Sequence, residues 1–297
     1  AEPEPVAPEE APPWALDMLA LRFGLSPGER AAVLFAAASE CCGQTAALVA
    51  RIGSGPPTLG LAMRVCEGLD WAALRPDAAL RRARLIALAE VPGSGLSERP
   101  FRLDDNVLLF LNGCMQIAPE LIAVSQPLPA GTQLATDAAL VEAIARQCEG
   151  AGGKAMGLPV IELVASARGD GVAHALAGLR AAGHGCLVVP LSRLPHDPEA
   201  LVRLRDLWLR DALLYNLALV LVDDAPGTAA LDPLVGGWAG PVALVTDTPR
   251  LELTPRRRFA IGHDRAQQRA AWQAALSEAG AAASPDAIDR LAHSFHL

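Results

Sequence analysis

From residue 158 to the last residue, short apolar runs alternate with helical segments, and this alternation constrains the fold more than any other feature. The runs expected as strands are Pro159–Ala165, Cys186–Leu191, Leu217–Val222, Pro241–Thr246 and Arg258–Ile261. The segments expected as helices are Val172–Ala182, Pro198–Tyr215, Ala229–Trp238, Arg265–Leu276 and Pro285–His293. Near-continuous apolar strands are typical of parallel sheets, because crossover helices bury both faces of such a sheet. The predicted fold class of residues 158–297 is therefore α/β, with Pro159–Ala165 central in a parallel sheet between helical layers.

Residues 14–124 have a helical pattern instead. Ser26 is an expected N-cap, with Pro27 in the first turn and Glu29 three residues on, as in a capping box. The other expected elements are helices near residues 42–51, 58–67 and 77–82, strands at Arg84–Val91 and Arg99–Leu103, and a helix at Asn106–Leu111. Several helices followed by a hairpin form the outline of a winged helix domain.

Two segments lie outside these units. Residues 1–13 (AEPEPVAPEEAPP) are rich in Pro and Glu and have little to bury, so we expect a disordered leader. Residues 125–157 are expected to be a linker with one short helix, Ala138–Gln147, and a glycine-rich loop, Glu149–Gly157. Because no apolar run reaches the length of a membrane span and no signal-peptide pattern opens the sequence, we expect a soluble, cytoplasmic protein.

The balance of charge disfavours nucleic acid as the main partner. The chain has 297 residues and a net charge of -8, and Lys154 is its single lysine. Residues 1–150 contain 18 acidic residues and 11 arginines, whereas nucleic-acid-binding domains are typically basic. The six cysteines form no C-x-x-C pair, so we expect small buried side chains; no metal site is predicted from them or from the histidines.

The turn after the first expected strand stands where a phosphate-binding loop would lie. Such a loop needs glycines to wrap phosphates, a lysine to reach them and a Ser or Thr to ligate magnesium. Compared with G-x-x-x-x-G-K-[ST], Gly171 is kept, whereas Ser166, Val172 and Ala173 replace the first glycine, the lysine and the hydroxyl; Gly169 lies between them. The pattern allows the loop shape to persist without its charge and metal ligand. The alternative is an ordinary glycine turn.

Two further strands end in acidic residues. Asp223 and Asp224 follow the apolar run LALVLV, as in a Walker B element, whose first acid helps to hold magnesium and whose second activates water. Asp247 ends the run PVALVTD. An ordinary strand end remains the alternative for the strand that ends in Asp223 and Asp224. We expect Asp170, in the turn itself, together with Asp223 and Asp224 to repel a triphosphate, and Arg168 is the one residue there that could offset them.

These patterns resemble a bacterial AAA+ ATPase family with an N-terminal winged-helix domain, a degenerate first ATPase module and an intact second one. The stretches LRFGLSPGERAAVLFAA, PPTLGLAMRV, ALRRARLIAL and PFRLDDNVLLFLNG, between Leu21 and Gly113, resemble the N-terminal domain, and residues 158–297 resemble the degenerate module. The resemblance implies a P-loop NTPase-like αβα sandwich. Asp224 stands where the family usually has Glu, and Asp247 where its sensor-1 strand usually has Asn. Since the chain stops at Leu297, within the first helix of the family's lid, we expect a fragment with an incomplete lid.

The resemblance also implies a function: the partner-binding and assembly half of a protein-remodelling ATPase, a family often associated with contractile injection systems. Its implied partners are proteins, and the full-length protein is expected to form a hexamer-type ring. This chain is expected to be inactive and to need no cofactor, with Mg-ATP serving the missing second module. Two alternatives stay open: a winged-helix DNA-binding regulator, in which Arg81, Arg82 and Arg84 contact phosphates, and a free-standing pseudo-ATPase scaffold.

Overall fold

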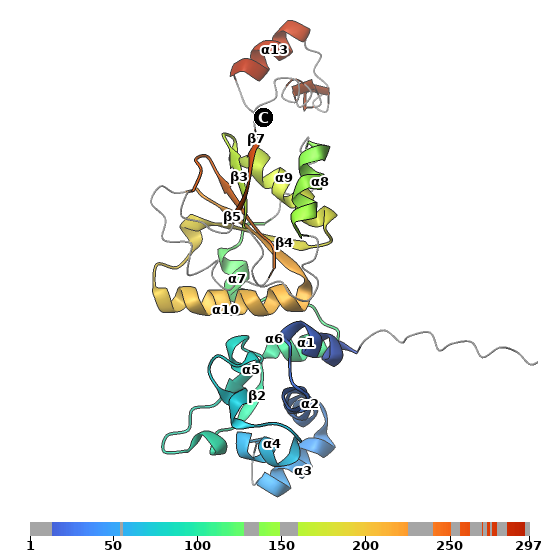
Figure 1. The fold of residues 1–297 in the computed structure, drawn as a ribbon, viewed down its shortest axis with the longest axis vertical. Coiled ribbons are helices and arrows are strands. Elements are labelled where there is room, and N and C mark those ends of the chain that lie inside the picture. Colours follow the sequence, from blue (N-terminus) through green and yellow to red (C-terminus); the bar gives the residue numbers. More distant parts are fainter. Residues whose placement is uncertain are drawn as a thin grey trace, which may run out of the picture. The chain divides into compact units, whose positions relative to one another are not determined.

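The computed structural model of the chain describes residues 14–53, 56–127, 137–148, 160–224, 240–250, 256–261, 269, 272–273, 275–277 and 284–294. The chain divides into two compact units, Ala1–Ala118 and Pro119–Leu297, and each is described by itself (Figure 1). Four expected segments lie wholly or mostly outside the described residues: the leader 1–13, the loop Glu149–Gly157, and the helices Ala229–Trp238 and Arg265–Leu276.

The first unit consists of short helices and one hairpin. Its helices are α1 (Ala15–Phe23), α2 (Pro27–Cys41), α3 (Gly43–Gly53), α4 (Leu59–Val65), α5 (Ala79–Arg82) and α6 (Asp105–Leu111), with 3-10 turns η1 (Trp71–Leu74) and η2 (Leu96–Glu98). Strands β1 (Ile86–Leu88) and β2 (Phe101–Leu103) pair antiparallel. The expected helices and hairpin are therefore present, although both strands are shorter than the apolar runs suggested.

Capping residues fix where these helices begin. The Ser26 hydroxyl accepts a hydrogen bond from the Glu29 amide at 3.2 Å, and the Glu29 carboxylate accepts one from the Ser26 amide at 2.8 Å. The capping box expected for α2 is thus confirmed. Asp104 caps α6 in the same way, by accepting a hydrogen bond from the Asn106 amide.

The second unit is built around a five-stranded sheet. Its strands are β3 (Val160–Ala165), β4 (Gly185–Pro190), β5 (Leu217–Val222), β6 (Val242–Thr246) and β7 (Arg256–Ile261). They lie in the order β4-β5-β6-β3-β7, and every neighbouring pair is parallel. The predicted parallel α/β architecture is confirmed. The first strand, β3, is interior, but β6 holds the middle place that we expected β3 to occupy.

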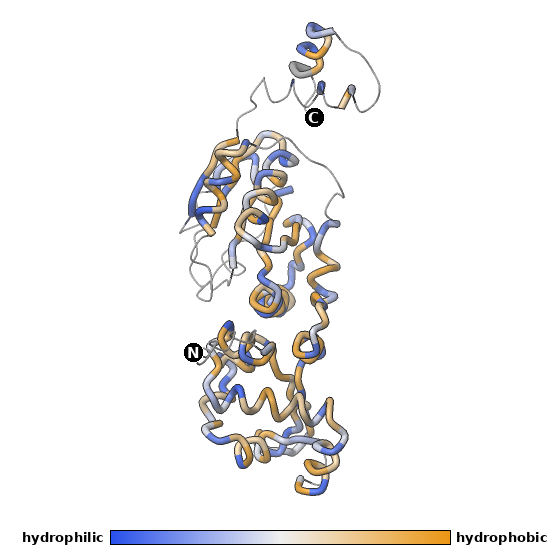
Figure 2. The backbone as a smooth tube through the Cα atoms, turned by 90° about the vertical axis from the view of Figure 1, so that its right-hand side faces the viewer, coloured by the Kyte–Doolittle hydropathy of each residue, from blue (hydrophilic) through white to orange (hydrophobic). Residues whose placement is uncertain are grey.

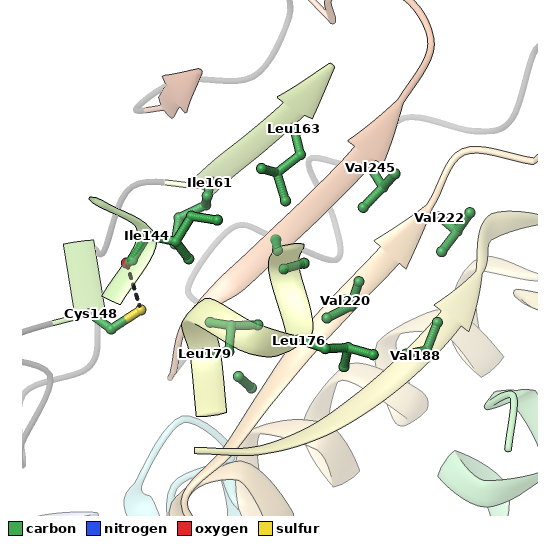
Figure 3. Packing of buried hydrophobic residues seen from close by; sticks show 13 residues of the cluster. Ile144, Cys148, Ile161, Leu163, Leu176, Leu179, Val188, Val220, Val222 and Val245 are labelled. Atoms are coloured by element: carbon green, nitrogen blue, oxygen red, sulfur yellow. Dashed lines mark hydrogen bonds between the residues drawn. The ribbon is translucent and has the colours of Figure 1, made fainter. Parts of the chain in front are cut away.

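Helices cover both faces of this sheet. They are α7 (Pro119–Val124), α8 (Ala138–Cys148), α9 (Arg168–Ala181) and α10 (Pro198–Tyr215); α13 (Pro285–Ser294) comes later in the chain, and a 3-10 turn, η3 (Leu191–Arg193), follows β4. On one face, Ile144 of α8 and Leu176 and Leu179 of α9 pack against Ile161 and Val220 of the sheet (Figure 3).

On the other face, α7 and α10 contribute Leu121 and Trp208 to the walls of a small apolar cavity. Leu187 of β4 and Leu219 of β5 complete those walls, together with their apolar neighbours. Alternate residues of one strand therefore meet different helical layers, as the two-residue period of a strand requires.

Apolar residues run along the helices of the first unit as well as through the sheet (Figure 2). Among the described residues, no single helix combines the length and hydropathy needed to cross a membrane. Helices α2 and α3 meet that requirement only when taken together, and the chain bends by 108° between them.

Candidate functional site

The strand order points to one edge of the sheet as the place for a ligand. The connection that leaves β3 passes β6 and β5 to reach β4, whereas the connection that leaves β6 passes β3 in the opposite direction to reach β7. Ligands of open α/β sheets bind at the carboxyl ends of neighbouring strands whose connections leave in opposite directions. The candidate site is therefore the carboxyl edge, which we define as the residues that follow β3, β5 and β6.

The turn after β3 is much shorter than a phosphate-binding loop. Only Ser166 and Ala167 separate β3 from α9, which begins at Arg168 and not at Val172 as expected. The amides of Asp170 and Gly171 already bond to the Ala167 carbonyl, at 3.1 and 3.4 Å, as in a helix. The expectation that the loop shape persists is therefore wrong, because the residues that would wrap a phosphate form the first turn of α9.

Val172 and Ala173, which replace the lysine and the hydroxyl of a phosphate-binding loop, lie on the side of α9 that packs against the sheet. Val172 packs against the apolar cluster beneath the helix, and Ala173 is buried. Gly169 and Ser166 are exposed. A Cβ on Gly169 would have no atom within 4 Å, so nothing in the packing requires glycine there.

Gly171 is required by packing. A Cβ at this position would lie 2.5 Å from Cγ1 of Val245 and 3.3 Å from Cβ of Ala165. The start of α9 can approach β6 this closely only without a side chain. The glycine that matches the phosphate-loop pattern therefore serves the contact between helix and sheet.

Arg168 and Asp247 form an ion pair between the residues that follow β3 and β6. The Arg168 guanidinium donates to the Asp247 carboxylate at 2.9 Å, and the two side chains are 43% and 51% exposed. Such an exposed pair contributes little to stability, typically less than about 1 kcal/mol. It does neutralise the one cation that the sequence places at the start of α9.

Asp223 is paired with an arginine that the sequence analysis did not identify. The amide of Asp223 donates to the Val245 carbonyl at 2.9 Å, so Asp223 and Gly171 contact the same residue of β6. A guanidinium nitrogen of Arg250 lies 3.3 Å from the Asp223 carboxylate, and the two side chains are only 18% and 12% exposed.

Glu162 is the second residue of this region that sequence reasoning missed. It lies within β3, its side chain is fully buried, and it faces Arg258 in the register of β3 and β7. Its carboxylate accepts from Arg258 Nε at 2.7 Å and from the backbone amide of Arg250 at 2.5 Å, and it lies 3.7 Å from Arg256 Nε. A lone glutamate in the apolar run PVIELVA was the available signal, since a buried carboxylate needs paired charges and hydrogen bonds.

Asp224 has a structural contact of its own. Its carboxylate accepts hydrogen bonds from the amide and the hydroxyl of Ser192, at 2.9 and 2.5 Å, which ties the end of β5 to the turn η3 after β4. Burial raises the pKa of Asp224, but the hydrogen bonds from Ser192, a further backbone hydrogen bond and the nearby charge of Arg168 together outweigh it, so the pKa is lower than that of an ordinary aspartate. The carboxylate is therefore engaged as a charged acceptor.

The charges of the carboxyl edge are thus satisfied within the chain. Asp223 pairs with Arg250, Asp247 with Arg168, and Asp224 with Ser192. Of the three acids expected to repel a triphosphate, Asp170, Asp223 and Asp224, Asp223 differs from the expectation, because Arg250 neutralises it. Within the described ranges, no group of three or more His, Cys, Asp or Glu side chains is arranged to hold a metal ion.

The first unit presents apolar side chains to solvent. Leu48 and Ile52, one turn apart on α3, are 53% and 55% exposed, and Trp71 is also exposed. Of the arginines considered for DNA, Arg81 is engaged in the fold, because it donates to the Leu74 carbonyl at 3.1 Å; Arg82 is exposed.

The expectation that the six cysteines are small buried side chains is wrong for three of them. Cys41, Cys42 and Cys114 are exposed, whereas Cys66 and Cys148 are buried. α3 begins directly after Cys41-Cys42, and only Val49 of α3 is buried, so this end of the helix pair faces solvent.

Comparison with known proteins identifies the first unit. Residues 9–125 match the family model described as a winged helix domain, variant, so the N-terminal part of the chain contains a winged helix domain. The match runs past Ala118 and includes α7, which packs within the second unit. No curated protein matches the chain.

Proposed function

We propose that this chain is a nucleotide-independent assembly module, the N-terminal half of a AAA+ protein-remodelling ATPase. In this proposal the winged helix domain binds a protein partner, and the α/β unit is a P-loop NTPase-type module that no longer binds nucleotide. The observation that carries it is the carboxyl edge. Three motifs that the sequence assigns to one pocket meet there, and their charged groups pair with residues of the same chain.

Each loss at this edge removes a specific contribution to nucleotide binding. A two-residue turn offers no loop of amides to the phosphates, and Val172 offers no charge. Asp223 is already neutralised by Arg250, so a magnesium ion would have to displace a guanidinium. Hydrolysis in the complete protein is assigned, in this proposal, to a second module, and the link to contractile injection systems rests on the family resemblance.

The chain is expected not to bind Mg-ATP in isothermal titration calorimetry, with no affinity tighter than about 1 mM. The reason is that each group that would meet the phosphates or the metal is missing or paired. A phosphate-release assay should likewise give no turnover. Micromolar binding, or turnover that Asp223→Ala abolishes, would overturn the proposal and assign the missing charge to Arg168 or to a neighbouring subunit.

The second candidate is a DNA-binding regulator, which the winged helix domain itself favours. Exposed Leu48 and Ile52 suit a protein partner better, since apolar side chains gain nothing from phosphates. In gel-shift titrations at physiological salt, random duplexes should bind no tighter than the non-specific range of about 10⁻⁴–10⁻⁶ M. Nanomolar, sequence-specific binding that is lost in Arg82→Ala would instead favour the regulator. Arg82 is the cleaner test, because Arg81 also supports the fold.

A further inference from the structure

Arg250 lies beside Asp223, which corresponds in the proposed function to the metal-binding acid of an active ATPase module. We infer that its guanidinium replaces that metal ion, and that it holds the carboxyl edge in one conformation without nucleotide. This inference rests on the proposed function, since it assigns to Asp223 the position of a metal-binding acid.

Both partners of this ion pair are anchored through their backbones. The Asp223 amide bonds to the Val245 carbonyl at 2.9 Å, which fixes the carboxylate at the end of β5. The Arg250 amide bonds to the buried Glu162 carboxylate at 2.5 Å, which fixes the arginine beside β3. Arg250 therefore joins β3 to β5 across the intervening β6, through its backbone at one end and its side chain at the other.

Burial and charge explain why a fixed cation is needed here. With side-chain exposures of 12% and 18%, Asp223 and Arg250 are screened by water far less than the pair of Arg168 and Asp247. A carboxylate at this depth without a cation would be strongly unfavourable. In an active module the metal ion and its nucleotide supply that charge only while bound, whereas a guanidinium is charged at every accessible pH.

The test is a double-mutant cycle on the purified chain without nucleotide, using Arg250→Met, Asp223→Asn and the double variant. Arg250→Met keeps the apolar stem but removes the guanidinium that pairs with Asp223, so its melting temperature should fall clearly below that of the wild type. The double variant should recover much of the loss, because both charges are gone. Arg203→Met is the matched control; it removes an exposed pair with Glu120 in the same unit and should leave the melting temperature nearly unchanged.

Additive losses in the cycle would overturn the inference. Because no nucleotide is present, these outcomes are independent of the Mg-ATP titration, which alone decides the proposed function.

Discussion

Glu162→Gln is expected to destabilise the second unit by about 3 kcal/mol, near the lower end of the cost of breaking a buried ion pair. The substitution keeps the shape of the side chain but removes the charge that faces Arg256 and Arg258. Those guanidinium groups keep some contact with solvent, which limits the cost. Because the chain has two units, the loss is best measured by native-state hydrogen exchange at the amides of β3 and β5.

Glu120→Gln is the matched control for this prediction. It removes the acid of an exposed pair with Arg203 in the same unit, and its cost should be below about 1 kcal/mol. Equal effects of the two variants would contradict the assignment of Glu162 as the buried centre that joins β3, β7 and the residues after β6.

Gly171→Ala is expected to destabilise the same unit by about 1–3 kcal/mol through overpacking. The new methyl group would lie 2.5 Å from Cγ1 of Val245, so either the helix or that side chain must shift. Adding Val245→Ala should relieve the clash, and the two substitutions should therefore be strongly non-additive. Hydrogen exchange at the β6 amides measures the effect.

Gly169→Ala provides the control within the same turn of α9. Its Cβ would meet no atom within 4 Å, and alanine is the better helix former, so this variant should be neutral or stabilised by up to about 1 kcal/mol. If Gly171→Ala were as stable as Gly169→Ala, the packing explanation for Gly171 would be wrong. A glycine retained for a phosphate loop would then be the better account.

Much of the α/β unit could be predicted because its pattern is set by local burial. Leu217–Val222 and Pro198–Tyr215 have the expected bounds, since one is a continuous apolar run and the other begins with Asp197-Pro198 as cap and first turn. The start of α9 was missed by four residues. Two glycines around Asp170 suggested a turn, but Asp170 suits the first turn of a helix and Gly171 is required by Val245.

The charged contacts of the site could not be predicted, because they join residues that are distant in sequence. Arg250 reaches Asp223 and Glu162 only after the strand order has placed β3, β6 and β5 side by side. The sequence did indicate that Asp223 and Asp247 each follow a strand of the same sheet. It did not indicate which arginine each would meet.

The charged groups of the carboxyl edge pair with residues of the same chain, and we claim that they therefore do not bind nucleotide. The most direct test of this claim is an NMR titration with Mg-ATP. The amide resonances of Arg168, Gly169 and Asp170 report on the first turn of α9, where a phosphate would have to bind. We predict that none of these resonances shifts at nucleotide concentrations up to about 1 mM, the weak limit of ordinary ligand affinity. Saturable shifts at Gly169 and Asp170, accompanied by a shift at Asp223, would contradict the account.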